Sequence, residues 1–158
     1  MLCASATPAL AADQTAKDPK GKTVRIPDAV ATKLKDKHNL KIATVKTWLP
    51  KSATTFTKGT RKEYVKGLTK IECAANILGV VKCRNTGEKV NLLFVVDFRI
   101  DSTTNKQVGL VTAYCDGYYY RCPSWVTSEP IDLKHPTTAT GPMGTSGSGG
   151  GGGSGGSW

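Results

Sequence analysis

Four cysteines constrain this chain more than any other feature. A fifth, Cys3, lies in an Ala-rich start in which Ala9-Leu10-Ala11 matches the small-x-small pattern that signal peptidases cut. Removing that start leaves an even number of cysteines, as expected for an exported protein stabilised by disulfides. We therefore predict a secreted, extracellular protein, with envelope association as a variant, that contains Cys73, Cys83, Cys115 and Cys122.

The cysteine spacing favours disulfides over a metal site. The intervals are C-x9-C and C-x6-C, whereas structural zinc sites use tighter pairs, and both histidines, His38 and His135, lie far from these cysteines in the sequence. Four cysteines allow three connectivities. We expect Cys73–Cys83 and Cys115–Cys122, because each pair brackets a predicted turn. We expect neither a metal nor a cofactor.

Composition divides the chain into four parts. We interpret residues 1–11 as an export-signal remnant and 12–23 as a flexible, Lys-rich lead-in. Residues 24–136 form a single disulfide-stabilised domain, and 137–158 a proline-containing, then Gly/Ser-rich, flexible tail. No apolar run has the length of a transmembrane helix, so no transmembrane segment is expected.

The first half of the domain predicts one helix between short strands. A strand is expected at 24–26, followed by a helix at 29–37 that Asp28 caps and His38-Asn39 closes. The β-branched stretch 40–49 predicts a strand ended by Pro50. Residues 51–66 have no clean period and predict an exposed loop or irregular strand.

The second half is β-rich. Apolar runs at 68–73 and 77–83 are followed by a predicted turn at 84–88, and residues 90–100 alternate between apolar and polar faces. With a turn at 101–106 and a strand at 108–114, they predict a long β-hairpin; a last short strand is expected at 127–133. The fold class is therefore α+β, with an antiparallel sheet of about four to six strands and one short N-terminal helix; all-β is the alternative.

The net charge of +10 is confined to the first half of the chain. Residues 1–71 contain 15 Lys and Arg against 5 Asp and Glu, whereas residues 72–158 contain 7 of each. Such an excess favours anionic partners, including cell-envelope polymers, or it simply keeps a secreted protein soluble. Lysine rather than arginine dominates, which argues against nucleic acid.

The candidate binding site is a tyrosine-rich loop. The sequence between Cys115 and Cys122 begins with an Asp-Gly turn signal, and aromatic rings and arginine are typical of binding hot spots. The alternative is that these rings cover the core beside the disulfide. The candidate residues, for a protein or glycan partner, are Tyr118, Tyr119, Tyr120, Arg121 and Trp125.

Catalytic signals are weak. Outside the Gly/Ser-rich tail, where any glycine pattern arises from composition alone, no G-x-S-x-G, H-E-x-x-H or phosphate-binding glycine loop occurs. Asp97 and Asp101 flank Arg99 on a predicted strand, as in an ordinary charged face. We therefore interpret the protein as a small secreted binding module without catalysis, including a hydrolase or protease inhibitor as one version. A secreted enzyme with an unrecognised active site and a cationic membrane-active protein are the alternatives.

The disulfide hypothesis is testable by intact mass. Each disulfide forms with loss of two hydrogen atoms, so the natively secreted protein should be about 4 Da lighter than its fully reduced form. Mass spectrometry before and after reduction measures this difference. Free thiols at these four positions, or a bound zinc ion, would contradict the hypothesis.

Overall fold

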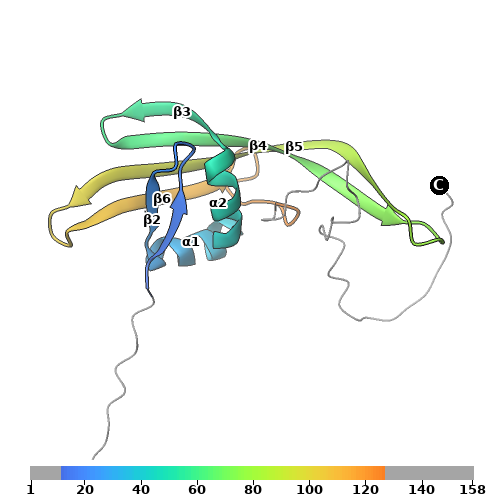
Figure 1. The fold of residues 1–158 in the computed structure, drawn as a ribbon, viewed down its shortest axis with the longest axis horizontal. Helices are drawn as coiled ribbons and strands as arrows, with labels where there is room; N and C mark the ends of the chain where they lie inside the picture. The colour runs from blue at the N-terminus through green and yellow to red at the C-terminus, as the bar shows by residue number, and fades with distance from the viewer. Residues whose placement is uncertain (1–11, 127–158) are drawn as a thin grey trace, which may run out of the picture.

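The computed structural model describes residues 12–126, which form two antiparallel sheets and two short helices (Figure 1). Strands β3, β4, β5 and β6 are hydrogen-bonded in that order, and β1 pairs with β2. This is the predicted α+β class, with two helices instead of one and strands divided between two sheets. The elements are β1 (Gln14–Lys17), β2 (Thr23–Ile26), α1 (Asp28–His38), α2 (Ile42–Trp48), the 3-10 turn η1 (Leu49–Lys51), β3 (Ala53–Lys58), β4 (Arg61–Ala75), β5 (Val81–Asp101) and β6 (Lys106–Cys115).

Several predictions concern parts of the chain beyond this region. The export-signal remnant (1–11), the last strand (127–133) and the Gly/Ser-rich tail (137–158) lie outside the described residues. Within residues 12–126, no helix has the length and apolar character needed to cross a bilayer.

The core forms where the apolar face of β5 meets the helical layer. The predicted alternation holds, since Leu92, Phe94 and Val96 are fully buried. Elements α1 and β2 contact β6, and α2 contacts β1, so the helices and the β1–β2 hairpin form a layer against the sheet. The other main contributors to the core are Val24, Ile26, Leu34, Leu40, Val45, Leu49, Tyr64 and Leu110. Only the end of the predicted apolar face departs from the pattern, because Ile100 is exposed.

Helix α1 confirms the predicted helix but not its cap. Pro27 occupies the N-cap and Asp28 is the first helical residue, with no side-chain cap hydrogen bond. The predicted closure is confirmed, because Asn39 adopts the left-handed conformation with φ of 51° and its N–H bonds to the Leu34 carbonyl.

The predicted strand at 40–49 is wrong, because this segment forms α2 and η1. Its β-branched residues favour strand locally, but Val45 and Leu49, four residues apart, are both fully buried, as on one helical face. Tertiary burial therefore overrides a weak local preference. Pro50 fits within the first turn of η1, where no amide donor is needed.

The lead-in at 12–23, expected to be flexible, contains β1 and an ordered turn around Asp18. The buried Asp18 carboxylate accepts bonds from the N–H groups of Lys20 (2.9 Å) and Lys22 (2.8 Å), and from the Tyr64 hydroxyl (3.1 Å). Burial, followed by the adjacent Asp18 charge, raises the pKa of Tyr64 well above its usual range, which keeps this hydroxyl a donor.

The segment 51–66 is more regular than expected, and only part of it is exposed as predicted, because Ser52 is buried and Tyr64 lies in the core. It forms β3, in which every residue is exposed, and the start of β4. The pairing between these two strands shifts register between Thr54 and Phe56. Edge position explains the exposure, since β3 has a neighbour on one side within the described sheet.

Strands β4 and β5 continue beyond the core as a two-stranded arm, here defined as residues 70–88 (Figure 1). The predicted turn at 84–88 is wrong: β5 runs through it, with Gly87 at φ of 80° beside a register shift in the β4–β5 pairing. This is a bulge, because residues 86–88 lie between the successive partners Asn85 and Lys89. The chain reverses instead at 76–80.

Both predicted disulfides are present, Cys73–Cys83 and Cys115–Cys122, with Cα–Cα distances of 4.0 and 4.9 Å. The first joins residues directly opposite each other in the arm. The second closes the loop that follows β6. The first disulfide therefore holds the projecting arm, whereas the second is buried in the core cluster at the base of its loop.

Gly109 provides a test of how β2 packs on β6. Its φ is +78°, and a Cβ added there would lie 2.8 Å from the Arg25 carbonyl carbon. Gly109→Ala should therefore lower the free energy of unfolding by roughly 2–4 kcal/mol, measured by urea denaturation of the oxidised protein.

Gly21→Ala is the matched control, because φ there is +79° but no atom lies within 4 Å of the added Cβ. It should cost about 1 kcal/mol through backbone strain alone. Equal effects of the two substitutions would contradict the close packing of β2 on β6.

Candidate binding surface

The candidate site is the loop that Cys115 and Cys122 enclose, called here the tyrosine loop (residues 116–121). Cys115 ends β6 opposite Leu92 of β5, and both cysteines are almost completely buried. The Asp116 N–H donates to the Asn91 carbonyl at 2.9 Å, and Gly117 takes φ of 80°. The loop therefore leaves the sheet through a fixed turn, as the Asp-Gly pair predicts.

Two consecutive tyrosines in this loop have unusual backbone angles. Tyr119 and Tyr120 have φ of 50° and 62°, in the left-handed region that residues with a Cβ disfavour. Such a conformation costs on the order of 1–3 kcal/mol per residue and persists only where surrounding contacts impose it.

Those contacts come from the C-terminal end of α1. The Cys122 N–H donates to the His38 carbonyl at 2.8 Å, and Asn39 Nδ2 donates to the Cys122 carbonyl at 2.9 Å. His38 Nδ1 lies 2.8 Å from the Tyr120 carbonyl, which can only accept, so this nitrogen carries the proton. Arg121 adds a longer bond of 3.3 Å to the Asp36 carbonyl. Loop and helix end thus form one hydrogen-bonded unit.

The candidate side chains divide into an outward and an inward set. Tyr119 is 100% exposed and Tyr120 is 61% exposed, and the Arg121 side chain is also exposed. The Tyr120 ring meets the Tyr114 ring edge-on, with centroids 5.0 Å apart. Exposed rings on a held backbone are available for contact with a partner.

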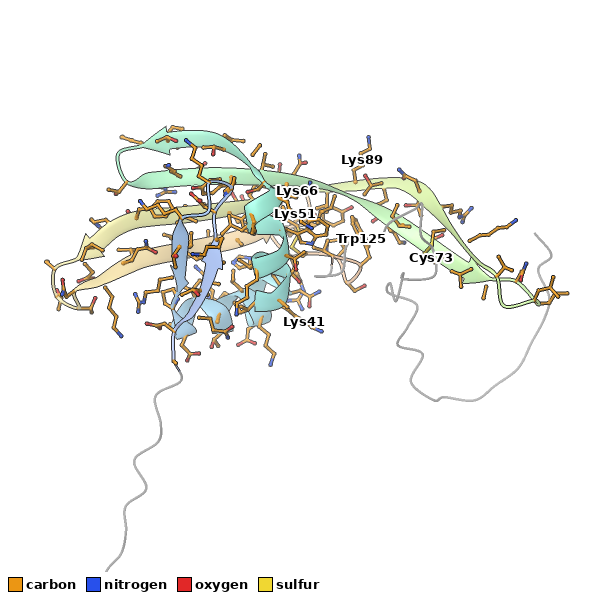
Figure 2. The ribbon with its side chains drawn as sticks, in the orientation of Figure 1. Lys41, Lys51, Lys66, Cys73, Lys89 and Trp125 are labelled. Atoms are coloured by element: carbon orange, nitrogen blue, oxygen red, sulfur yellow. A yellow bond between two sulfur atoms is a disulfide. The ribbon has the colours of Figure 1, made fainter. Side chains whose placement is uncertain are left out.

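Tyr118 and Trp125 point inward and pack partly against the core. Glu88 Oε1 accepts bonds from the Tyr118 hydroxyl (3.3 Å) and from Trp125 Nε1 (3.1 Å), and Glu88 Oε2 lies 3.5 Å from Lys70 Nζ. Burial, followed by the Glu88 charge, raises the pKa of Tyr118, so its hydroxyl stays a donor. The geometry of Tyr118 and Trp125 therefore fits side chains that cover the core better than side chains that contact a partner. Figure 2 shows Trp125 close to the root of the arm.

Many lysines of the basic half also have partners within the fold. Lys22 and Lys62 lie 4.0 and 5.6 Å from the Phe98 ring centroid, and Lys51 and Lys66 lie 5.3 and 5.8 Å from that of Trp48. Lys51 and Lys66 are labelled in Figure 2. In each pair the lysine Nζ lies over the face of the ring, as in a cation–π interaction.

The carboxylates considered for catalysis bind main-chain or hydroxyl donors. Asp97 Oδ1 accepts from Arg99 N–H (2.9 Å) and Thr60 Oγ1 (2.7 Å), and Asp101 Oδ1 accepts from Thr103 N–H (2.7 Å). These bonds lower the pKa of both carboxyls, with the backbone N–H of Arg99 and of Thr103 as the main causes. Both remain ionised near neutral pH, which does not suit a general acid. His135 lies outside the described residues.

Some elements of this surface were not identified from the sequence. His38 and Asn39 were interpreted only as a helix end, and Glu88 as part of a turn, because their partners lie 30 to 83 residues away in the chain. No local pattern signals such contacts. Within residues 12–126, no group of three or more metal-ligating side chains is close enough to hold an ion.

Comparison with protein-family models, with curated proteins and with solved structures finds no match to this chain. Its function is therefore argued from the geometry of its own residues.

Substitution of Asn39 tests whether its hydrogen bond to Cys122 anchors the tyrosine loop. Asn39→Ala removes both the bond to Cys122 and the tolerance for left-handed backbone, and it should lower the free energy of unfolding by about 1–3 kcal/mol in urea denaturation. Tryptic cleavage after Arg121 should become faster. Asn39→Gly keeps the backbone tolerance, so it should cost about 1 kcal/mol while loosening the loop similarly. Wild-type stability and cleavage in both variants would contradict this anchoring.

Proposed function

We propose that this protein is a small secreted binding module without catalysis, which docks onto a partner protein through its tyrosine loop. The observation that carries the proposal is Tyr119, which is fully exposed and held in a left-handed conformation. Backbone strain concentrated at an exposed aromatic residue is a feature of functional sites.

Restricted motion of the loop supports this proposal. The Cys115–Cys122 disulfide and the hydrogen bonds to α1 fix the backbone on both sides of the exposed rings. A loop ordered before binding loses less conformational entropy when it docks. An inhibitor of a hydrolase or protease, which presents a braced loop to a cleft, is one version of this function.

The chemistry of the outward side chains favours a protein over a glycan. Tyr119, Tyr120 and Arg121 are of the types enriched at energetic hot spots of protein interfaces. Tyr118 and Trp125 both donate hydrogen bonds to Glu88, so they position the loop and do not contact the partner. The binding set is therefore narrower than the five residues that the sequence suggested.

The basic half adds long-range attraction to this local contact. With a net charge of +10, the protein favours a partner with an acidic surface, or an anionic envelope polymer near it, mainly by accelerating association. The two disulfides fit an oxidising compartment, and secretion belongs to the proposal.

Tyr119→Gly separates binding from structure. Glycine relieves the left-handed strain, so this variant should be as stable as the wild type or about 1 kcal/mol more stable. It should nevertheless weaken capture of the partner from the surrounding medium or envelope fraction by about tenfold or more. Urea denaturation and quantitative pull-down with the oxidised chain measure the two effects.

Phe56→Ser is the control, because Phe56 is 46% exposed on β3 and does not belong to the loop. It should capture the partner as well as the wild type does. Full capture by a Tyr119→Ser, Tyr120→Ser variant would refute the loop as the site and point to the lysine-rich surface.

A further inference from the structure

The far end of the arm carries a cluster of exposed aliphatic side chains. Ile77 is 102% exposed, Leu78 81% and Val80 50%, whereas Phe56 and Ile100 are exposed singly on other strands. Figure 1 shows this end projecting away from the helices, and Cys73 in Figure 2 marks its disulfide. Adjacent exposed aliphatic residues at the end of a projection indicate an apolar contact.

The turn that bears them is fixed by Asn76. Its Oδ1 accepts bonds from the N–H groups of Leu78 and Val80, both at 2.9 Å, and its own N–H donates to the Val80 carbonyl at 2.9 Å. The Gly79 N–H donates to the Asn76 carbonyl at 3.0 Å, with φ of 77° at Gly79. The Cys73–Cys83 disulfide joins the two strands just below.

These bonds determine which environment the turn can enter. The amide groups of residues 76, 78, 79 and 80 already have acceptors within the turn. An unpaired amide is costly in a medium without hydrogen-bonding partners, so internal pairing lowers the cost of entering hydrocarbon. The arm end therefore presents apolar side chains on a turn in which four backbone N–H groups are already paired.

The flanking charge is positive. From residue 74 to residue 84, the sequence has two charged side chains, Lys82 and Arg84. Arg84 lies directly opposite Glu72 in the strand pairing and forms an ion pair with it at 3.1 Å, and Glu72 also lies 3.4 Å from Lys70 Nζ. Lys82 therefore supplies the positive charge nearest the arm end. An apolar end with the Lys82 ammonium behind it complements a bilayer whose headgroups are anionic.

We propose that the arm end, residues 76–82, inserts into the boundary between headgroups and acyl chains of an anionic membrane. The choice of lipid over a protein pocket follows from residue type, because the exposed side chains are aliphatic, whereas protein hot spots are rich in Trp, Tyr and Arg and poor in Leu and Val. This inference goes beyond the proposed function, since it concerns a surface other than the tyrosine loop. Insertion of so few side chains gives reversible binding.

Co-sedimentation of the full oxidised chain with vesicles of phosphatidylcholine and phosphatidylserine tests the proposal. Ile77→Ser with Leu78→Ser should lower the partition coefficient by about tenfold or more, because two aliphatic side chains no longer enter the bilayer. The matched control, Phe56→Ser with Ile100→Ser, replaces two exposed apolar side chains elsewhere and should bind as the wild type does. Vesicles of phosphatidylcholine alone should bind the wild type more weakly.

A fluorescent side chain reports insertion directly. Leu78→Trp should shift its emission to the blue when the anionic vesicles are added, whereas Ile100→Trp should not shift beyond the wild-type background. Tyr119→Ser with Tyr120→Ser should bind vesicles normally, so failure of the membrane site and failure of the tyrosine loop are distinguishable.

Three results would overturn the membrane proposal. The first is no binding of the wild type to anionic vesicles at low salt. The second is binding of the Ile77→Ser, Leu78→Ser variant to anionic vesicles as strongly as the wild type, which would assign the attraction to lysine charge alone. The third combines two findings: the wild type does not bind vesicles, and the Ile77→Ser, Leu78→Ser variant no longer captures a protein partner that the wild type captures. That result would assign the arm end to a protein interface.

Discussion

The pairing of β4 with β5 is the constraint on which the rest of the structure depends. Strand β5 spans Val81–Asp101, and its last half places Leu92, Phe94 and Val96 in the core while its first half forms one side of the arm. The core residues fix the register, because a shift by one residue would turn these side chains to the opposite face. The bulge between Asn85 and Lys89 then shifts the β4–β5 pairing by two residues, and this second register sets Cys73 opposite Cys83.

The two projecting segments share one root on this strand. The Asp116 N–H binds the carbonyl of Asn91, and Glu88 binds Tyr118 and Trp125 of the segment that follows β6. The tyrosine loop therefore starts where the arm leaves the core. The β4–β5 pair of the arm is stiffened by its own hydrogen bonds and by a disulfide. It would therefore hold a partner at the tyrosine loop and a surface at the arm end at a fixed separation.

Local patterns predicted elements whose side chains meet the core with a regular period. The long hairpin and helix α1 were predicted because six alternating apolar residues and the Val30, Leu34 pair signal burial directly. The segment 40–49 was mistaken for a strand, because residues such as Val45 have a β preference that burial on a helix overrides. Gly87 was mistaken for a turn residue, because glycine with positive φ occurs in β-bulges as well as in turns.

The sequence by itself determined that four cysteines are available for two cross-links, where the positive charge lies and that a tyrosine-rich loop is present, since these are local properties. Which cysteines pair was an expectation among three connectivities, and the tertiary structure decided it. Only the tertiary structure decided which tyrosines face outward, because Tyr119 owes its conformation to hydrogen bonds between its neighbours and the distant end of α1. It also decided that Ile77 and Leu78 are exposed. An apolar run is ordinarily buried, and only the length of β4 and β5 beyond the core carries this one into solvent.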